Sequence, residues 1–326
     1  MEKRIREILN GVGPARALMV ANKLGLFDRL YEKPQRVEQI ARFLRLNRRG
    51  VDRLLNGLVA LGFLEKKEKI FSLPDAVAPY LTRQGDYSLT RWIDLSEDLW
   101  GAWTQLDQLV KKGQSSLSIM DLVHKNPRKL EDFVHGMHPR AVAAARLLEE
   151  RIDFHGVKYL LDVGGGPGTY TLEWSKGHPG LKGLIIDIPP VIRITREYIR
   201  RYHLEDRVEA KAKDVLLSPI GEGYDLALLA NLLQMHSPAD SKRLIKKVYA
   251  ALVPGGRAII HGFTKDAEGT QPPEAALFSL QIGLITPEGD AHRLSDELAW
   301  MEGAGFRDLQ IFEVAIAPST VIIGTK

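Results

Sequence analysis

Four glycines stand close together in the stretch LLDVGGGPGTY, directly behind a run of apolar residues. Glycine lets the chain turn sharply after a strand and lets a ligand approach the backbone closely, which is typical of a nucleotide-type site. The four are Gly164, Gly165, Gly166 and Gly168. A dinucleotide fingerprint would need a further glycine where Thr169 stands, and no lysine follows in the register of a phosphate-binding P-loop. The loop therefore predicts a nucleoside-like ligand rather than a dinucleotide or a triphosphate.

Three aspartates accompany this loop. Asp162 leads it, Asp187 ends the next apolar run, and Asp214 follows the predicted strand after that. A carboxylate at Asp187 can accept hydrogen bonds from both ribose hydroxyls, and one at Asp214 is within reach of an adenine amino group. A single aspartate after a strand is explained equally well by capping of the next helix. Three acids and four glycines at successive strand ends favour a nucleoside-binding site.

Two further polar residues, Gln234 and His236, follow another apolar run. Ser237 and Pro238 are typical of the cap and first residue of a helix, with Asp240 reaching back, so a helix is predicted to begin after His236. Gln234 and His236 then lie in a loop at the carboxyl end of a strand, where ligands of such sheets bind. His236 is either a proton acceptor or an inert packing histidine, whereas Gln234 can only form hydrogen bonds.

The strands that position these residues are predicted from four continuous apolar runs, VKYLLDV, GLIIDI, YDLALLA and RAIIHGF, which alternate with helical stretches. Strands buried on both faces and separated by helices indicate an α/β fold with a Rossmann-like, doubly wound, mostly parallel sheet. The closing segments FRDLQIFEVA and STVIIGTK, joined by a short link, predict an antiparallel pair that includes the last strand.

The N-terminal part shows a different sequence pattern, with amphipathic helices and a hairpin in place of continuous apolar runs. A helix is predicted over residues 14–30, two short amphipathic helices over 37–44 and 51–58, and a hairpin over 62–74. This order predicts a mainly α winged-helix domain. Polar residues on its second helix could contact nucleic acid. Alternatively, they could form the solvent-exposed face of a domain that serves assembly of subunits. These polar residues are Asn47, Arg48, Arg49, Arg53 and Asn56. A net charge of only +4 favours assembly.

Composition narrows the remaining possibilities. The 326 residues suffice for two domains with their own cores, and the absence of cysteine excludes thiol catalysis, disulfides and iron–sulfur clusters. No run of 18 or more apolar residues occurs, so no membrane span is expected, and a cytoplasmic location is predicted. The sequence has neither an H-x-x-x-H pattern nor a pair of carboxylates near the predicted pocket, so no metal site is expected.

The glycine loop, Asp187 in IIDIPPVI, Asp214 in KDVL and the segment ALVPGGRAII together resemble the motifs of class I S-adenosylmethionine-dependent methyltransferases. More narrowly, nearly the whole chain resembles the O-methyltransferase family of caffeate, hydroxyindole and bacterial polyketide enzymes. The resemblance implies that Gly164 and its neighbours lie against the methionine part of the cofactor and that Asp187 holds the ribose. It further implies that Asp214 and Val215 hold the adenine and that Asn231 contacts the cofactor.

The same resemblance implies a homodimer that acts on a small-molecule acceptor and binds neither nucleic acid nor membrane. It divides the chain into a dimerisation domain (1–105), linking helices that line the acceptor pocket (106–154) and a cofactor-binding domain (155–326). Linking helices are expected in 97–116 and 129–154, and His135 and His138 then lie in a pocket-lining segment. These two histidines and His261 are better explained by packing than by catalysis. His292 is a further catalytic candidate, because its loop closes over acceptors in the family.

One position departs from the family pattern. The family's general base is a histidine just after the fourth strand, and alignment without gaps places Gln234 there, with His236 at an aromatic position two residues on. A histidine that removes a proton from a phenol contributes roughly 10² to 10⁴ in rate. The departure leaves open O-methylation of an acidic hydroxyl, methylation of carbon, nitrogen or sulfur, and cofactor binding without methylation. The rival functions are a DNA-binding regulator with a ligand-sensing domain and a nicotinamide-dependent oxidoreductase.

Overall fold

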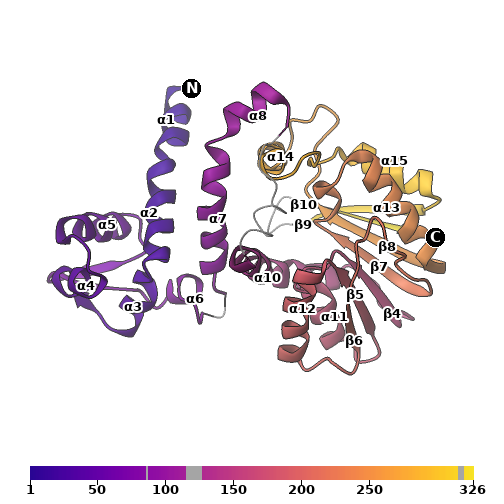
Figure 1. Cartoon of the computed structure of the whole chain (residues 1–326), viewed down its shortest axis with the longest axis horizontal. Helices are drawn as coiled ribbons and strands as arrows, with labels where there is room; N and C mark the ends of the chain where they lie inside the picture. Colours follow the sequence, from indigo (N-terminus) through magenta and orange to yellow (C-terminus); the bar gives the residue numbers. More distant parts are fainter. Residues whose placement is uncertain (86, 115–126, 315–318) are drawn as a thin grey trace. The chain divides into compact units, whose positions relative to one another are not determined.

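The computed structural model describes residues 1–85, 87–114, 127–314 and 319–326. Two compact units make up the chain, Met1–Trp100 and Gly101–Lys326 (Figure 1). The three-part division predicted from the sequence stays a prediction. In the described ranges no helix is both long and apolar enough to cross a membrane, and no cluster of three metal-ligating side chains occurs.

The first unit combines helices with a small antiparallel sheet of strand order β1-β3-β2. Its elements are α1 (Glu2–Asn10), α2 (Val12–Lys23), α3 (Leu26–Glu32), β1 (Gln35–Arg36), α4 (Val37–Leu44), α5 (Arg48–Ala60), β2 (Glu65–Lys67), β3 (Ile70–Ser72), α6 (Ala78–Leu81) and α7 (Thr90–Trp103), which crosses the boundary between the units. The predicted succession of two short helices and a hairpin is confirmed as α4, α5, β2 and β3.

The single helix predicted over 14–30 is wrong. Two helices, α2 and α3, occupy this stretch, and Gly25 between them has a φ of 63°. This left-handed conformation is one that glycine adopts without steric cost and that ends a helix. The apolar periodicity continues across the break, which explains why the pattern suggested one helix.

Three of the polar residues considered for nucleic-acid contact have local partners. The Asn47 side chain caps α5 by accepting a hydrogen bond from the Gly50 N–H. Arg48 forms an ion pair with Glu38, at 2.7 Å. The Asn56 side chain donates to the Asp52 carbonyl and accepts from Lys66. These contacts are those of a solvated helix surface and agree with the assembly interpretation.

The second unit is built on a seven-stranded sheet of order β6-β5-β4-β7-β8-β10-β9. Its elements are α8 (Leu106–Lys112), α10 (Pro127–Glu149), β4 (Tyr159–Val163), α11 (Thr169–Gly177), β5 (Lys182–Asp187), α12 (Pro189–Tyr202), β6 (Val208–Ala212), β7 (Tyr224–Ala230), the 3₁₀ turn η1 (Leu233–Met235), α13 (Pro238–Ala251), β8 (Leu252–Gly262), α14 (Pro273–Ile285), α15 (Leu294–Ala304), β9 (Arg307–Val314) and β10 (Ser319–Thr325).

The sheet has the predicted topology. β4 to β8 are parallel, while β10 runs antiparallel to both β8 and β9. The short link predicted between the last two strands falls on 315–318, outside the described residues. The chain moves outward from β4 to β6 and returns to place β7 on the other side of β4 (Figure 1). The strand order therefore reverses between β4 and β7, and such a switch point is where open α/β sheets bind ligands.

Both faces of the sheet are covered, which explains the continuous apolar runs. Leu160, Leu226 and Leu228 pack with residues of α10 and α11 in one cluster. Their neighbours Leu161 and Leu229 pack with residues of α13 and α15 in another. Successive strand residues point to opposite faces, so residues of both alternate sets are mostly apolar where both faces are buried.

Candidate functional site

The glycine loop lies at the switch point and contacts the loop that follows β7. Gly164 has a φ of 65°, and a Cβ atom on it would lie 2.6 Å from Cδ1 of Leu232. Only glycine avoids both the strained backbone and this overlap. The two loops that the sequence singled out, one after β4 and one after β7, are thus packed against each other at the carboxyl edge of the sheet.

Asp187, at the end of β5, ties its strand to this loop. Its Oδ2 accepts a hydrogen bond from the Gly166 N–H at 2.8 Å, and its Oδ1 accepts one from the Ile188 N–H at 2.7 Å. Burial raises the pKa of the Asp187 carboxyl, and these two N–H groups oppose that rise. Each carboxylate oxygen can accept more than one hydrogen bond, so both retain capacity for a ligand hydroxyl.

Asp162 lies beneath the loop. Its Oδ2 accepts a hydrogen bond from the Thr171 hydroxyl at 2.7 Å, whereas Oδ1 is buried without a partner among the described residues. Burial raises the pKa of Asp162 to about 7. A Cβ atom on Gly165 would lie 2.7 Å from the Asp162 Cγ, so a glycine is required above this carboxyl.

Asp214 follows β6 and is exposed. Its Oδ1 accepts from the N–H groups of Leu216 and Leu217, at 2.9 and 3.1 Å, and so holds a turn. The stretch between β6 and β7 is described in full and holds no helix, so the helix-capping alternative does not apply to Asp214. The same turn is held by Lys247, whose ammonium donates to the carbonyls of Val215, Leu216 and Ser218. Lys247 is one of several lysines in its helix, and no sequence signal distinguishes it.

The Val215 side chain is buried in the core on the side of α13. Asn231 follows β7 with a φ of 54°, is exposed, and donates its backbone N–H to the His261 carbonyl. Asn231 is a residue type that tolerates this left-handed conformation. The structure thus brings Asp187, Asp214 and Asn231 to the same edge of the sheet as the glycine loop.

Gln234 lies inside η1 and is buried. A Cβ atom on Gly262 would lie 3.1 Å from its Oε1, so the amide is directed toward the end of β8. The predicted helix start is confirmed, because α13 begins at Pro238 and the Ser237 side chain accepts from the Asp240 N–H.

His236 stands between η1 and α13 and is half-buried. Burial lowers the pKa of His236, against an opposing rise from the Asp240 and Asp214 carboxylates. The imidazole is therefore neutral at pH 7, the state that a proton acceptor requires.

His292 is buried beneath this loop. Its Nε2 lies 3.0 Å from the carbonyl oxygen of Leu233, and its ring meets the Trp300 ring edge to face, with centroids 4.9 Å apart. A carbonyl only accepts hydrogen bonds, so Nε2 carries the proton. Burial lowers the pKa of His292, which keeps the ring neutral. The geometry gives His292 a structural contact to the Gln234 turn.

Each of the three histidines expected to serve packing lies within hydrogen-bonding distance of a neighbouring hydroxyl. Nδ1 of His135 lies 2.9 Å from the Tyr198 hydroxyl, and Nδ1 of His138 lies 2.8 Å from the Thr169 hydroxyl. His261 is held between the hydroxyls of Tyr170 and Ser319 at 3.0 and 2.9 Å. Burial lowers the pKa of both His138 and His261 to about 4.

Met137 is a loop neighbour that sequence reasoning did not assign. Its Cε would lie 3.5 Å from a Cβ atom on Gly166. Thr195 also holds the loop, because its hydroxyl donates to the Gly166 carbonyl at 2.6 Å. Both residues lie on helices whose apolar periodicity accounts for them as ordinary core positions, so no pattern marks them.

The chemistry of the site is that of an acceptor-rich cradle. Carboxylates lie at the carboxyl edge of three neighbouring strands, β4, β5 and β6, and among the described residues one of their oxygens has no partner. The glycine loop after β4 carries no cationic side chain. Such a set suits a ligand with hydroxyls, an amino group and positive charge, because anionic side chains stabilise cations and accept from donors. It is less suited to a pyrophosphate.

Two family models match the chain. The first, described as the O-methyltransferase domain, covers residues 103–307. The second, described as the O-methyltransferase dimerisation domain, covers residues 7–91.

Individual relatives match over most of their length. The 3-hydroxy-5-methyl-1-naphthoate 3-O-methyltransferase of Streptomyces sahachiroi is 24% identical over 99% of this chain and 94% of its own. The L-tyrosine C(3)-methyltransferase of Streptomyces lavendulae is 29% identical over 86% of this chain and 80% of its own. PigF, an S-adenosyl-L-methionine-dependent methyl transferase of Serratia sp., is 26% identical over 97% of this chain and 93% of its own. A solved structure of PigF with SAH superposes with a TM-score of 0.90, at 25% identity, over 100% of this chain and 99% of that chain.

Proposed function

Because the chain belongs to the O-methyltransferase family, we propose that it transfers the methyl group of S-adenosylmethionine to a small aromatic acceptor. The observation that carries this proposal is the acceptor-rich cradle at the switch point, where Asp187 is hydrogen-bonded to the glycine loop. A dinucleotide oxidoreductase would need a glycine at Thr169, and that residue instead begins α11.

In this proposal the cofactor is held by the residues expected from the sequence. They are Gly164, Gly165, Gly166, Asp187, Asp214, Val215 and Asn231. When bound, the cofactor supplies a methyl group already activated by its sulfonium, so the protein's main task is to orient the nucleophile and exclude water. Asp187 accepts from ribose hydroxyls, while Asp214 and the turn held by Lys247 receive the adenine side.

Gln234 occupies the position of the family's base and orients the acceptor through its amide. An amide neither takes nor releases a proton at neutral pH, so an acceptor hydroxyl must arrive ionised or pass its proton to His236. Carbon and nitrogen acceptors remain compatible with this site. Family membership extends to a tyrosine C-methyltransferase as well as to O-methyltransferases.

We further propose that the chain acts as a cytoplasmic homodimer through its first unit and binds no nucleic acid, in keeping with the dimerisation-domain match over 7–91. Sedimentation should give twice the chain mass. A labelled DNA duplex should stay free at low salt; binding that weakens steeply with salt would instead support the regulator. The division into 1–105, 106–154 and 155–326 belongs to this proposal.

Calorimetry with S-adenosylmethionine and NAD tests the cofactor assignment. We expect binding of S-adenosylmethionine alone, and Asp187→Asn should raise its Kd by roughly 10- to 100-fold, because a charged hydrogen-bond acceptor is lost. Glu205→Gln, an exposed acid before β6, serves as the control. Transfer of a labelled methyl group to phenolic, amine and aromatic-carbon acceptors, with the product identified by mass spectrometry, tests the reaction. Binding without transfer to any acceptor class would contradict it.

A further inference from the structure

Asp162 is a buried acid outside the set of residues proposed to hold the cofactor. Its side chain is 1% exposed, and a Cβ atom on Gly165 would lie 2.7 Å from its Cγ, so the carboxyl lies directly beneath the glycine loop. The Thr171 hydroxyl donates to Oδ2, whereas Oδ1 has no partner among the residues that the structure describes. A buried carboxyl with an unsatisfied oxygen is costly, so packing alone does not account for Asp162.

The ionisable groups around Asp162 do not offset its charge. Burial raises the pKa of Asp162 to about 7, and the Asp187 carboxylate at the end of β5 adds to the rise. Tyr170, on α11, is a neutral phenol, because burial raises its pKa as well. α10 contributes His138, whose pKa burial lowers to about 4, and Arg140, which interacts electrostatically with Tyr170. Within the described ranges, no cation shifts the pKa of Asp162.

The cofactor and the product left after methyl transfer differ by one charge. S-adenosylmethionine carries a sulfonium, whereas S-adenosylhomocysteine has a neutral sulfur; the ammonium and the carboxylate are common to both. In the proposed function the methionine part, which includes this sulfur, lies against the glycine loop. Charges interact more strongly through buried protein than through water, so an ionised Asp162 beneath the loop favours the ligand with the additional positive charge.

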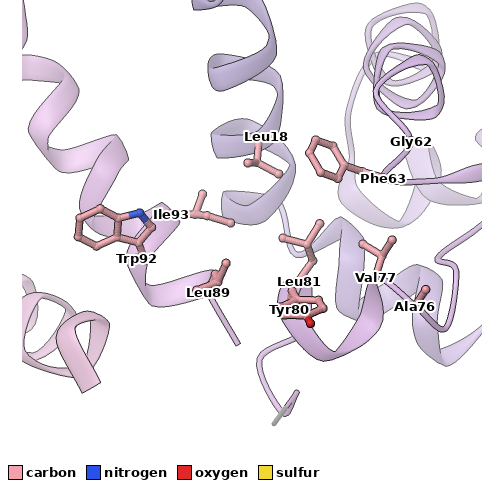
Figure 2. A pocket seen from close by; sticks show the side chains of 10 residues that line it. All are labelled: Leu18, Gly62, Phe63, Ala76, Val77, Tyr80, Leu81, Leu89, Trp92 and Ile93. Atoms are coloured by element: carbon pink, nitrogen blue, oxygen red, sulfur yellow. The ribbon is translucent and has the colours of Figure 1, made fainter. Parts of the chain in front are cut away.

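The apolar hollow of the first unit cannot make this distinction. It has a volume of about 380 Å³ and is lined by side chains such as Leu18, Phe63, Leu81 and Ile93 (Figure 2). Carbon atoms make up almost the whole wall, so the hollow does not separate a cationic ligand from a neutral one by charge.

We propose that Asp162 makes the glycine loop selective for the cationic cofactor over its neutral, demethylated product. Asp162 acts through space from beneath the loop and holds no ligand atom. Because an ionised Asp162 and a bound cation stabilise each other, binding of the cofactor releases the Asp162 proton to solvent, whereas binding of the product leaves most of it in place. Weaker binding then speeds product release. This role rests on the proposed function, because a methyltransferase meets both ligands in each cycle.

Calorimetry at about pH 6.5 in two buffers of different ionisation enthalpy counts the protons released on binding. Asp162, with a pKa of about 7, is mostly protonated at this pH in the free protein, and the α-amino group of either ligand stays charged. We expect S-adenosylmethionine to release about half a proton, and S-adenosylhomocysteine less than half of that amount. Release no greater with S-adenosylmethionine than with S-adenosylhomocysteine would overturn the role of Asp162 and leave the cofactor assignment intact. Failure to bind S-adenosylmethionine would refute the proposed function itself.

Asp162→Asn keeps the shape of the side chain and an acceptor for the Thr171 hydroxyl, but carries no charge. In the wild type the Kd of S-adenosylhomocysteine divided by that of S-adenosylmethionine should rise about fivefold between about pH 5.5 and pH 7.5, as Asp162 ionises. In Asp162→Asn this ratio should stay within about twofold. Asp206→Asn, the same change at an exposed acid before β6, should follow the wild type.

An equal rise of the ratio in Asp162→Asn and in the wild type would show that another group sets the selectivity. Circular dichroism and urea denaturation check that each variant is folded. If Asp162→Asn does not fold, the wild-type comparison of proton release for the two ligands still decides, because it needs no substitution.

Discussion

Nε2 of His292 lies 3.0 Å from the carbonyl oxygen of Leu233, one residue before Gln234. The Ser241 hydroxyl donates to the same carbonyl at 3.2 Å. The backbone N–H of Lys265 donates to the His292 carbonyl, so the contact joins the segments after β8 and α14 to η1. His292 therefore holds the turn that carries Gln234, a residue of the proposed acceptor site.

Replacement of His292 by Ala should slow methyl transfer without removing a base. Loss of the His292 hydrogen bond costs about 0.5–1.5 kcal/mol, because Ser241 still donates to the same carbonyl. The loss should appear as lower unfolding stability and as a kcat lowered roughly 5- to 100-fold through misplacement of Gln234. Urea denaturation and steady-state kinetics measure the two effects, with exposed His155→Ala as the control. The shape of the pH–rate profile should not change. Loss of an acid limb in the variant would mean that His292 is the base.

Gly168→Ala should impair both stability and cofactor binding. Gly168 has a φ of 77°, and its added Cβ would lie 2.4 Å from Cδ1 of Ile185. A left-handed alanine costs about 1–2 kcal/mol and overpacking adds about 1–3 kcal/mol. Displacement of the loop should raise the Kd for S-adenosylmethionine about tenfold. Gly180→Ala is the matched control, since its Cβ would meet no atom within 4 Å and its φ is ordinary. Similar losses in both variants would refute the role of the loop.

The rate of O-methylation should follow the ionisation of the acceptor. With Gln234 in the position of the base, kcat/KM for a phenol should rise about tenfold per pH unit until the acceptor's own pKa, near 10 for an unsubstituted phenol. More acidic phenols should reach their plateau at correspondingly lower pH. Gln234→Ala should lower the whole profile by a constant factor, and His236→Asn should leave its shape unchanged. A profile that flattens above a pKa below 7 and loses this feature in His236→Asn would identify His236 as the base.

The fold and the edge of the sheet that binds ligands could be predicted because they depend on local and periodic signals. Continuous apolar runs mark β4, β5, β7 and β8, and parallel strands place their carboxyl ends together. The glycines and acidic residues at the ends of these runs were therefore expected to lie at the same edge of the sheet. The Ser237 cap likewise fixed the start of α13 from three neighbouring residues.

The contacts that decide side-chain roles could not be predicted, because they join residues far apart in the sequence. His292 and Leu233 are separated by 59 positions, and Lys247 reaches the turn at Val215 across 32. The break at Gly25 was missed for a local reason, since apolar spacing is continuous through it and only its backbone angle differs.

Acid should destabilise the protein through its buried histidines, and His261 allows the effect to be isolated. Its ring is enclosed by Tyr170 and Ser319, and burial lowers its pKa to about 4 from the ordinary 6.5. Between these two values the unfolded chain binds the proton and the folded chain does not, so stability is full above about pH 6.5 and falls as the pH drops toward 4.

At about pH 5 the loss from His261 should be about 2 kcal/mol, since each pKa unit corresponds to about 1.4 kcal/mol. His261→Gln should therefore lose less stability than the wild type between about pH 7.5 and pH 5, by roughly that amount, even though the substitution lowers stability at both. Urea denaturation at the two pH values gives the comparison, and exposed His155→Gln should behave as the wild type does. An unchanged pH dependence in His261→Gln would mean that the ring takes up its proton in the folded protein near its ordinary pKa, and that the hydroxyls around it accommodate the charge.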